Sequence, residues 1–355
     1  MTAEQDLPRA RDERFAYVLL CHVDEDAVLR TARRIRELSP GAHVLLRHSR
    51  GEQFLAEEAA AGAGAEVLRS EIGIRWGTWS TVAAVLEALA DAEGRWQPSY
   101  TVVLSGQDYP VRDLVAWERS VRGSGADALL HPEQGCHEGR HAVCWHALPA
   151  ARWVPVPLLA ALAHVGNRIV HRVPWLPRAH HAGERTWMLA HPRWRRRRPP
   201  VPYRKGSLWM TLSHRGVAAL LRAGVHGSAG ARFFASTLLP DESFAHSVLG
   251  AAADVRVRAG VTTVAFFGEQ DGHARVLGEG DLAQVLATGA AFARKVLPGV
   301  GDGFVSAADE RLAAAARSAP VESVAGPGPG PVLEPAAPVE SIASAGPLPR
   351  EPALG

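Results

Sequence analysis

The chain has 355 residues, of which 47% are hydrophobic, so it can bury one large or two modest cores. Its formal net charge is only +2 with the histidines neutral, which argues against a protein that coats nucleic acid. The three cysteines, Cys21, Cys136 and Cys144, cannot all pair with one another and lack the short paired spacings of a structural zinc site. We therefore expect a reducing compartment.

No apolar run in the sequence is suited to span a membrane. The run at residues 15–20 is short, and the longer run at 153–165 contains two prolines and a histidine. We therefore expect a cytoplasmic protein without an integral membrane segment. Four consecutive arginines at 195–198 leave peripheral contact with an anionic membrane, an anionic acceptor or nucleic acid open, but a solvated loop is the simpler interpretation.

Strand and helix patterns alternate over the first hundred residues. The apolar run at 15–20 predicts a strand, and the acidic residues at 24–26 predict the cap of an amphipathic helix that ends at Leu38. Further strands are predicted at 43–46, 65–68 and 100–104, and further helices at 52–61 and 79–93. This alternation predicts a parallel sheet with helices on both faces, and the turn at 105–110 lies where ligands gather in such sheets.

The rest of the sequence is less regular. Residues 131–205 are rich in Pro, Trp, His and Arg with little periodicity, which is typical of a variable segment over the sheet or a mobile flap. Beyond it, strands are predicted at 208–212 and 261–267, and helices at 214–222, 242–249 and 281–287. We expect one domain at 15–317, an N-terminal tail at 1–14, and a disordered tail at 318–355, where the composition is Ala, Pro, Gly, Ser and Glu.

Short motifs follow one another in a characteristic order. They are RWGTWS at 75–80, SGQDYP at 105–110, GSLWMTLS at 206–213, PDESF at 240–244 and FARK at 292–295. Together they resemble the core-2/I-branching β-1,6-N-acetylglucosaminyltransferase and xylosyltransferase family, over about residues 15–298. The resemblance implies a GT-A type α/β fold, with a Rossmann-like mixed sheet flanked by helices. It also implies a UDP-sugar donor, inversion at the anomeric carbon, and no divalent metal.

Glu242 occupies the position that matches the family's catalytic base. Inversion by direct displacement needs one carboxylate, which accepts the proton of the acceptor hydroxyl as its oxygen attacks the anomeric carbon. Asp241 is expected to cap a helix, so that Glu242 projects from the first turn toward the end of the sheet. The PDESF motif alone favours the interpretation of Glu242 as an ordinary acidic residue at a helix N-terminus. The presence of the other motifs favours the catalytic base instead.

The resemblance also implies a set of donor-binding residues. Lys295, assisted by Arg294, is expected to neutralise the diphosphate in place of a metal ion, and Trp76 to lie against the uracil ring. Leu20 and Ser49, near the ends of the first two strands, are expected at the nucleotide, although the family carries an aspartate where this chain has Ser49. Without the other motifs, Trp76 would be read as a core residue, and the two basic residues as a solvated helix end.

One cation of the family pattern is missing. The family's second diphosphate-binding cation lies at the start of a strand where this chain has Thr262 and Thr263. Three neighbouring residues are alternatives for this charge: Arg256, Arg258 and Arg275. Otherwise the stabilisation of the leaving group is weaker than in the family.

The acceptor side departs from the family further. Ser105 is expected beside the acceptor, and Asp108 is expected to fix its turn through backbone hydrogen bonds. Because this turn has a single aspartate, no Asp-x-Asp metal site is expected. His131 stands near the place of the family's acceptor carboxylate and Glu133 follows two residues later, so the acceptor should differ.

The sequence therefore predicts a metal-independent, inverting glycosyltransferase that transfers GlcNAc or xylose from a UDP-sugar to an acceptor hydroxyl, in β linkage. The acceptor is a carbohydrate, a metabolite or a peptide, with no cofactor and no nucleic-acid partner. Two alternatives remain. One is a weak or inactive relative that binds a nucleotide or a glycan, and the other is an enzyme on the same scaffold with a different nucleotide-sugar donor.

Overall fold

The structure is a computed structural model that describes most of the chain outside its tails. The described residues are 12–22, 24–49, 55–133, 138–149, 178–181, 186–190, 197–267 and 274–318. The predicted C-terminal tail therefore lies outside the described residues from 319 onward, and the N-terminal tail does so up to residue 11. Cys136 and the first two arginines of the run at 195–198 also lie outside them.

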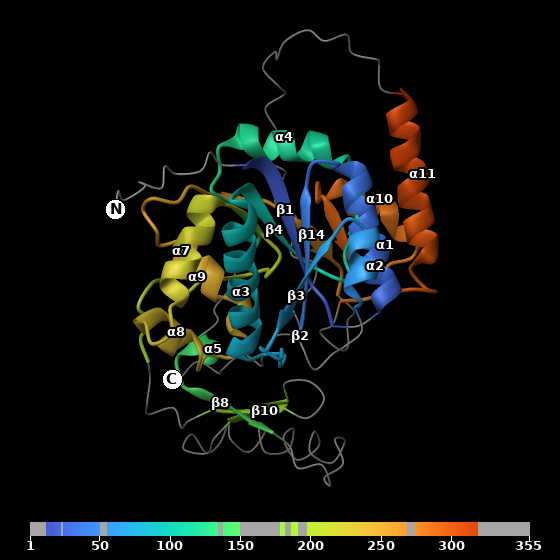
Figure 1. Ribbon diagram of the computed structural model, residues 1–355. Helices are drawn as coiled ribbons and strands as arrows, with labels where there is room; N and C mark the ends of the chain where they lie inside the picture. The colour runs from blue at the N-terminus through green and yellow to red at the C-terminus, as the bar shows by residue number, and fades with distance from the viewer. Residues whose placement is uncertain are drawn as a thin grey trace, which may run out of the picture.

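A mixed sheet with the strand order β13-β6-β12-β4-β1-β2-β3 forms the centre of the protein (Figure 1). Its strands are β1 (Asp12–Leu20), β2 (His43–Ser49), β3 (Glu66–Ser70), β4 (Pro98–Ser105), β6 (Ala128–Leu130), β12 (Thr211–Ser213) and β13 (Val257–Ala259). β12 is antiparallel to both of its neighbours, whereas the other pairings are parallel. All strands of this sheet except β12 therefore end at one edge, which we call the carboxyl edge.

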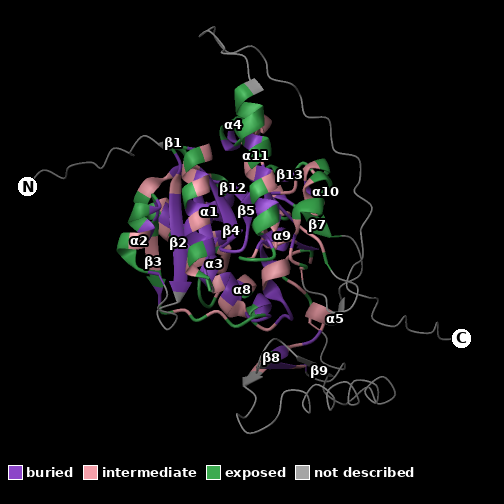
Figure 2. Ribbon diagram, turned by 90° about the vertical axis from the view of Figure 1, so that its right-hand side faces the viewer, coloured by how far each residue is buried: buried purple, intermediate pink, exposed green. Residues whose placement is uncertain are grey.

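Helices cover both faces of this sheet. They are α1 (Glu25–Leu38), α2 (Glu57–Gly62), α3 (Trp79–Trp96), α4 (Leu114–Ser124), α7 (His214–Gly224), α8 (Ala229–Phe234) and α9 (Phe244–Leu249). In β1, Tyr17 and Leu19 pack with α1 and α4, whereas Ala16 and Val18 pack with α3. Figure 2 shows the central strands buried and the outer helix faces exposed. The predicted α/β class, with a Rossmann-like mixed sheet flanked by helices, is confirmed.

A smaller sheet extends the carboxyl edge beyond β4. It has the order β14-β15-β5 and consists of β14 (Thr263–Ala265), β15 (Phe292–Arg294) and β5 (Tyr109–Pro110). The elements beside it are the 3₁₀ helix η2 (Glu279–Asp281), α10 (Leu282–Ala287) and α11 (Asp302–Ser318). α11 is held against the domain by Asp309, which accepts a hydrogen bond from Tyr109 Oη (2.9 Å) and forms an ion pair with Arg34 (2.8 Å).

The segment at 131–205 contains regular structure in its described part. β7 (Pro132–Glu133) pairs with β11 (Lys205–Gly206), and the short helix α5 is Glu138–His141. β8 (Trp145–Pro149), β10 (Thr186–Ala190) and β9 (Arg178–His181) form an antiparallel sheet. These strands are too short to give a readable alternation in the sequence.

Two predicted elements of the second half begin at other residues than expected. The predicted strand at 208–212 begins only at Thr211, and the earlier residues Lys205 and Gly206 pair with a different strand, β7. The predicted helix at 242–249 is divided into the 3₁₀ helix η1 (Pro240–Glu242) and α9, which begins at Phe244. By contrast, Asp24 caps α1 as predicted and accepts a hydrogen bond from the Ala27 N–H (3.3 Å). Within the part of the chain that the structure describes, no helix is both long and apolar enough to cross a membrane.

Candidate active site

The carboxyl edge brings together the predicted residues at the strand ends. Leu20 and Ser105 are buried neighbours in the register of β1 and β4, and the Gly106 N–H donates to the Leu20 carbonyl (3.0 Å). Ser49 ends β2 at the same edge, opposite Ser70 of β3, but its side chain lies outside the described part of the structure. Parallel strands thus place the end of β1 directly beside the turn at 105–110.

Asp108 organises this turn as predicted. Its Oδ2 accepts hydrogen bonds from the Ser105 N–H (3.0 Å) and from Thr263 Oγ1 (3.3 Å). Its Oδ1 binds Arg294 Nη1 (2.9 Å). Burial raises the pKa of Asp108, and the charge of Arg294 and these hydrogen bonds offset only part of that effect. Asp108 therefore joins the turn to β14 and to the end of β15.

The two basic residues of the FARK motif have different surroundings. Arg294 ends β15, and its guanidinium is held by Asp108 and lies over the Trp209 ring, 4.6 Å from the ring centroid. The side chain of Lys295 is half-buried, and burial and the adjacent charge of Arg294 lower its pKa. Arg294 is thus committed within the protein, which leaves Lys295 as the cation of this motif that can meet a ligand.

His22 is a candidate site residue that the sequence reasoning missed. It follows the carboxyl end of β1, and partial burial together with the positive charges of Arg294 and Lys295 lowers its pKa. A neutral imidazole beside two cations can donate one N–H to an anionic ligand. Its position directly after the first predicted strand was the available signal.

Glu242 lies at the end of η1 and is held by two cations. Both Arg140 Nη1 and Lys205 Nζ contact the same carboxylate oxygen, Oε2, and the Lys205 contact measures 3.3 Å. Lys205 also contacts Glu133 Oε2. The Lys205 side chain is only 9% exposed, whereas that of Glu242 is 29% exposed and so reaches the surface. Lys205 had no role in the sequence-based reading, because a lone lysine before a motif gives no distinguishing signal.

Asp241 does not cap a helix, contrary to the prediction. η1 has no side-chain cap, and Asp241 Oδ1 is buried without a hydrogen-bond partner among the described residues. Burial and the charge of Glu242 raise the pKa of Asp241 to about 7. Two carboxyl groups with very different surroundings are therefore adjacent in the chain.

The RWGTWS loop lies against the Glu242 segment. The Leu239 N–H donates to the Gly77 carbonyl (3.3 Å), and the rings of Trp79 and Phe244 form an edge contact with centroids 5.2 Å apart. Trp79 is thus a packing residue. Trp76 is 45% exposed, so it is not a core residue.

The segment at 205–210 connects the two halves of the site. Lys205 at its start contacts Glu242, and Trp209 near its end packs on Arg294. Between them the Ser207 N–H donates to the His131 carbonyl (3.0 Å). His131 is exposed, and burial of part of its ring lowers its pKa. Of the predicted acceptor residues, Glu133 therefore shares Lys205 with Glu242, and His131 contacts the same segment through its carbonyl.

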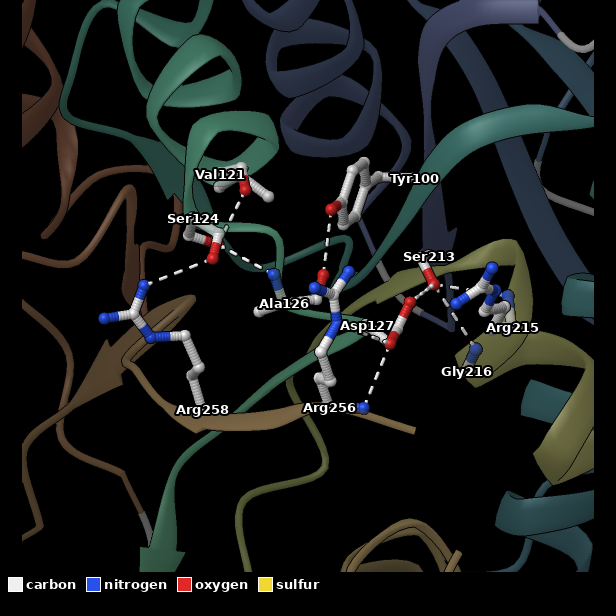
Figure 3. Close-up of polar contacts among 10 residues, drawn as sticks. All are labelled: Tyr100, Val121, Ser124, Ala126, Asp127, Ser213, Arg215, Gly216, Arg256 and Arg258. Carbon is white, nitrogen blue, oxygen red and sulfur yellow. Dashed lines mark hydrogen bonds and ion pairs between the residues drawn. The ribbon is translucent and has the colours of Figure 1, made fainter. Parts of the chain in front are cut away.

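The side chains of the three arginines considered as substitutes for the missing cation all have partners within the protein. Arg256 donates to Asp127 through its backbone N–H (3.0 Å) and Nε (3.4 Å), and Arg258 donates to the Ser124 carbonyl (3.4 Å). Figure 3 shows both in the network around Asp127, which precedes β6 at the opposite edge of the sheet. Arg275 makes two contacts of 2.7 and 2.6 Å with Asp281.

Two arginines of the run at 195–198 are described. Arg198 is exposed, but Arg197 is not solvated, which corrects the interpretation for that residue. Its guanidinium donates to the carbonyls of Ser236 (2.8 Å) and Phe233, and lies 4.2 Å from the centroid of the Phe233 ring. Burial lowers the pKa of Arg197. This arginine therefore fastens the segment before β11 to the end of α8.

Comparisons with known proteins give little further guidance. No family model matches the chain, and no curated protein matches it. A solved structure that is similar to part of it is glucosyl-3-phosphoglycerate synthase from Mycobacterium tuberculosis in complex with Mg²⁺ and uridine diphosphate, with 18% identity and a TM-score of 0.25. The similarity covers 50% of this chain and 56% of that one, so the chain spans about half the length of this neighbour.

Proposed function

We propose that this chain is a glycosyltransferase of the GT-A type that transfers a sugar from a UDP-sugar to an acceptor hydroxyl with inversion. One observation carries the proposal. The partly exposed carboxylate of Glu242 contacts Lys205, at one end of the segment 205–210, and Trp209 near the other end packs on Arg294, beside Lys295. A base and a cation for the leaving group thus belong to one continuous stretch of the carboxyl edge.

Glu242 is the proposed base. Its Oε2 is occupied by Arg140 and Lys205, while its Oε1 has no hydrogen-bond partner among the described residues. Oε1 accepts the acceptor's proton as the acceptor oxygen forms a bond to the anomeric carbon. The bond from that carbon to the UDP oxygen breaks at the same time, and UDP leaves from the opposite face.

Lys295 is the proposed cation for the departing diphosphate. Fixed positive charge in a partly dry site stabilises the negative charge that develops on a leaving group. Trp76 is proposed to stack on the uracil, and His22 to donate a hydrogen bond to the phosphates. With Lys295 in this place the reaction needs no divalent metal, and the order of the motifs favours GlcNAc or xylose as the transferred sugar. The acceptor, proposed to be a carbohydrate, a metabolite or a peptide, lies near Ser105, His131 and Glu133.

The test is a panel of UDP-sugars, first in thermal-shift binding and then in a UDP-release assay, each with magnesium or with chelator. Binding to the native state raises the melting temperature by mass action. We expect stabilisation and slow UDP release in chelator, release abolished in Glu242→Gln, and release unchanged in Glu310→Gln, an exposed position on α11. A strict requirement for magnesium would refute the metal-free mechanism.

A second candidate is a module that binds a nucleotide or glycan without turnover. Two observations favour it: Asp108 holds Arg294, and Thr262 and Thr263 stand where the family places its second cation. Nucleotide binding that Glu242→Gln leaves unchanged, together with no UDP release from any donor, would establish this candidate over the enzyme.

A further inference from the structure

We propose that Lys205 is a positioning residue for Glu242, with Glu133 as its counter-ion, and that this pair sets the charge and orientation of the Glu242 carboxylate. The inference rests on the proposed function, in which Glu242 is the base. It adds two residues that act through Glu242, and it makes a prediction about Glu242 itself that holds whether or not turnover is found.

The ammonium of Lys205 has the contacts that this role needs. It lies 3.3 Å from Glu242 Oε2, it also contacts Glu133 Oε2, and its side chain is only 9% exposed. A buried ammonium is costly unless carboxylates or other acceptors surround it. The partner carboxylates come from different elements, η1 and β7, so Lys205 joins the base to the strand that follows β6.

The backbone on both sides of Lys205 is fixed. Lys205 and Gly206 pair with β7, and before them the Arg204 N–H donates to Ser247 Oγ of α9 (2.9 Å). After them, the Ser207 carbonyl lies 2.9 Å from His246 Nε2 of the same helix. α9 follows Glu242 almost directly, so the residue that holds the base is tied to the helix that carries it.

Gly206 shows how closely these elements approach. A Cβ atom at this position would collide with the imidazole of His246 and with the His131 carbonyl oxygen. Only glycine therefore lets β11 lie between α9 and the loop after β6. This close approach leaves Lys205 little freedom to move away from Glu242.

The charges around Glu242 determine what its variants should do. The charged and titratable groups packed around the Glu242–Lys205 pair, among the described residues, are Arg140, Glu133, Asp241, Tyr203, His131 and His246. A nearby cation favours the ionised carboxylate, and a nearby anion disfavours it. Removing Lys205 should therefore make Glu242 harder to ionise, and removing the charge of Glu133 should make it easier to ionise.

The experiment measures the titration of Glu242 directly by carboxyl ¹³C NMR on the full chain with labelled glutamate, with the signal assigned from Glu242→Gln. We expect Lys205→Met to raise the titration midpoint by roughly one pH unit, Glu133→Gln to lower it, and Lys205→Arg to restore it. The control is Arg222→Met, which breaks the exposed pair with Asp254 and should leave the midpoint unchanged. The proposal would be overturned if the midpoint moved in the same direction in Lys205→Met and Glu133→Gln, or if it moved in neither variant.

Kinetics separate this inference from the proposed function. If UDP is released, Lys205→Met should lower kcat by about 10- to 100-fold with little change in KM for the donor, and shift the acid limb of the pH profile upward. A purely structural pair would lower the melting temperature and leave the pH profile in place. If the Glu242 midpoint moves in opposite directions in Lys205→Met and Glu133→Gln but no UDP is released, the role of Lys205 is upheld and the enzyme is rejected. If UDP is released but the midpoint does not move, the enzyme is upheld and the role of Lys205 is rejected.

Discussion

Replacement of Asp241 by asparagine should stabilise the protein at alkaline pH. The Asp241 carboxyl is buried beside Glu242, which raises its pKa from the 3.8 of an exposed aspartate to about 7. The folded protein therefore keeps this proton up to neutral pH, while the unfolded chain loses it near pH 4. Stability is lost as the pH rises between these two values and is constant above the higher one.

The magnitude follows from the two pKa values. Each pH unit between the two pKa values lowers the free energy of unfolding by about 1.4 kcal/mol. The total loss above pH 8 is therefore at most about 4 kcal/mol, and about 2.5 kcal/mol of it falls between pH 5 and pH 8. Partial exposure of the residue reduces this difference, and we expect about 2 kcal/mol. Asparagine has nearly the shape of the protonated acid and does not titrate, so the variant should lack this pH dependence.

The assay is urea unfolding of the wild-type protein and Asp241→Asn at pH 5 and pH 8, with Glu310→Gln as the control for loss of an exposed carboxylate. The free energy of unfolding of Asp241→Asn, relative to wild type, should increase by about 2 kcal/mol from pH 5 to pH 8. A constant difference between the two proteins over this range would refute the reasoning.

Three further predictions concern other residues. Trp76→Ala should weaken UDP binding about 10-fold or more in a thermal-shift titration without lowering stability, because the indole is exposed; unchanged affinity would remove it from the nucleotide site. Lys295→Met should lower kcat about 100-fold at unchanged stability. Arg294→Met should instead lower the free energy of unfolding in urea by about 3 kcal/mol, because it leaves the buried Asp108 unpaired. Equal stability of the two variants would contradict these separate roles of Lys295 and Arg294. Against the effect of burial, hydrogen bonds from Arg256 and Ser213 lower the pKa of Asp127, so this carboxylate stabilises the fold above about pH 4 and loses its effect as the pH falls through its folded pKa. Asp127→Asn should therefore be about 1 to 3 kcal/mol less stable at pH 7 and nearly equal to wild type in acid; a difference independent of pH would argue against it.

The elements of the first half could be predicted because their signals are local. The cap at Asp24 and the apolar face of α3 need only a few consecutive residues to be recognised. β1 reads as a continuous apolar run because both of its faces are covered, and this is the mark of a strand in the middle of a parallel sheet.

The site could be predicted only in outline. The motif order predicted roles for Glu242, Lys295 and Trp76, and these roles stay predictions. Nothing near these residues in the sequence indicated that Lys205 would contact Glu242 or that Asp108 would hold Arg294. These are contacts between segments far apart in the chain, and they depend on the strand order rather than on any local pattern. The helix expected to begin at Asp241 failed for a similar reason, since burial of its carboxyl near Glu242 overrides its preference for a cap.

The segment at 205–210 constrains how this protein can change during evolution. Loops usually tolerate insertions and deletions, because their ends can remain in place while the middle varies in length. Here Lys205, the first residue of the segment, contacts Glu242, and Trp209, near the other end, packs on Arg294. One added or removed residue would shift one of these contacts out of register. Relatives that keep the same site should therefore keep the length of this segment, even where its side chains differ.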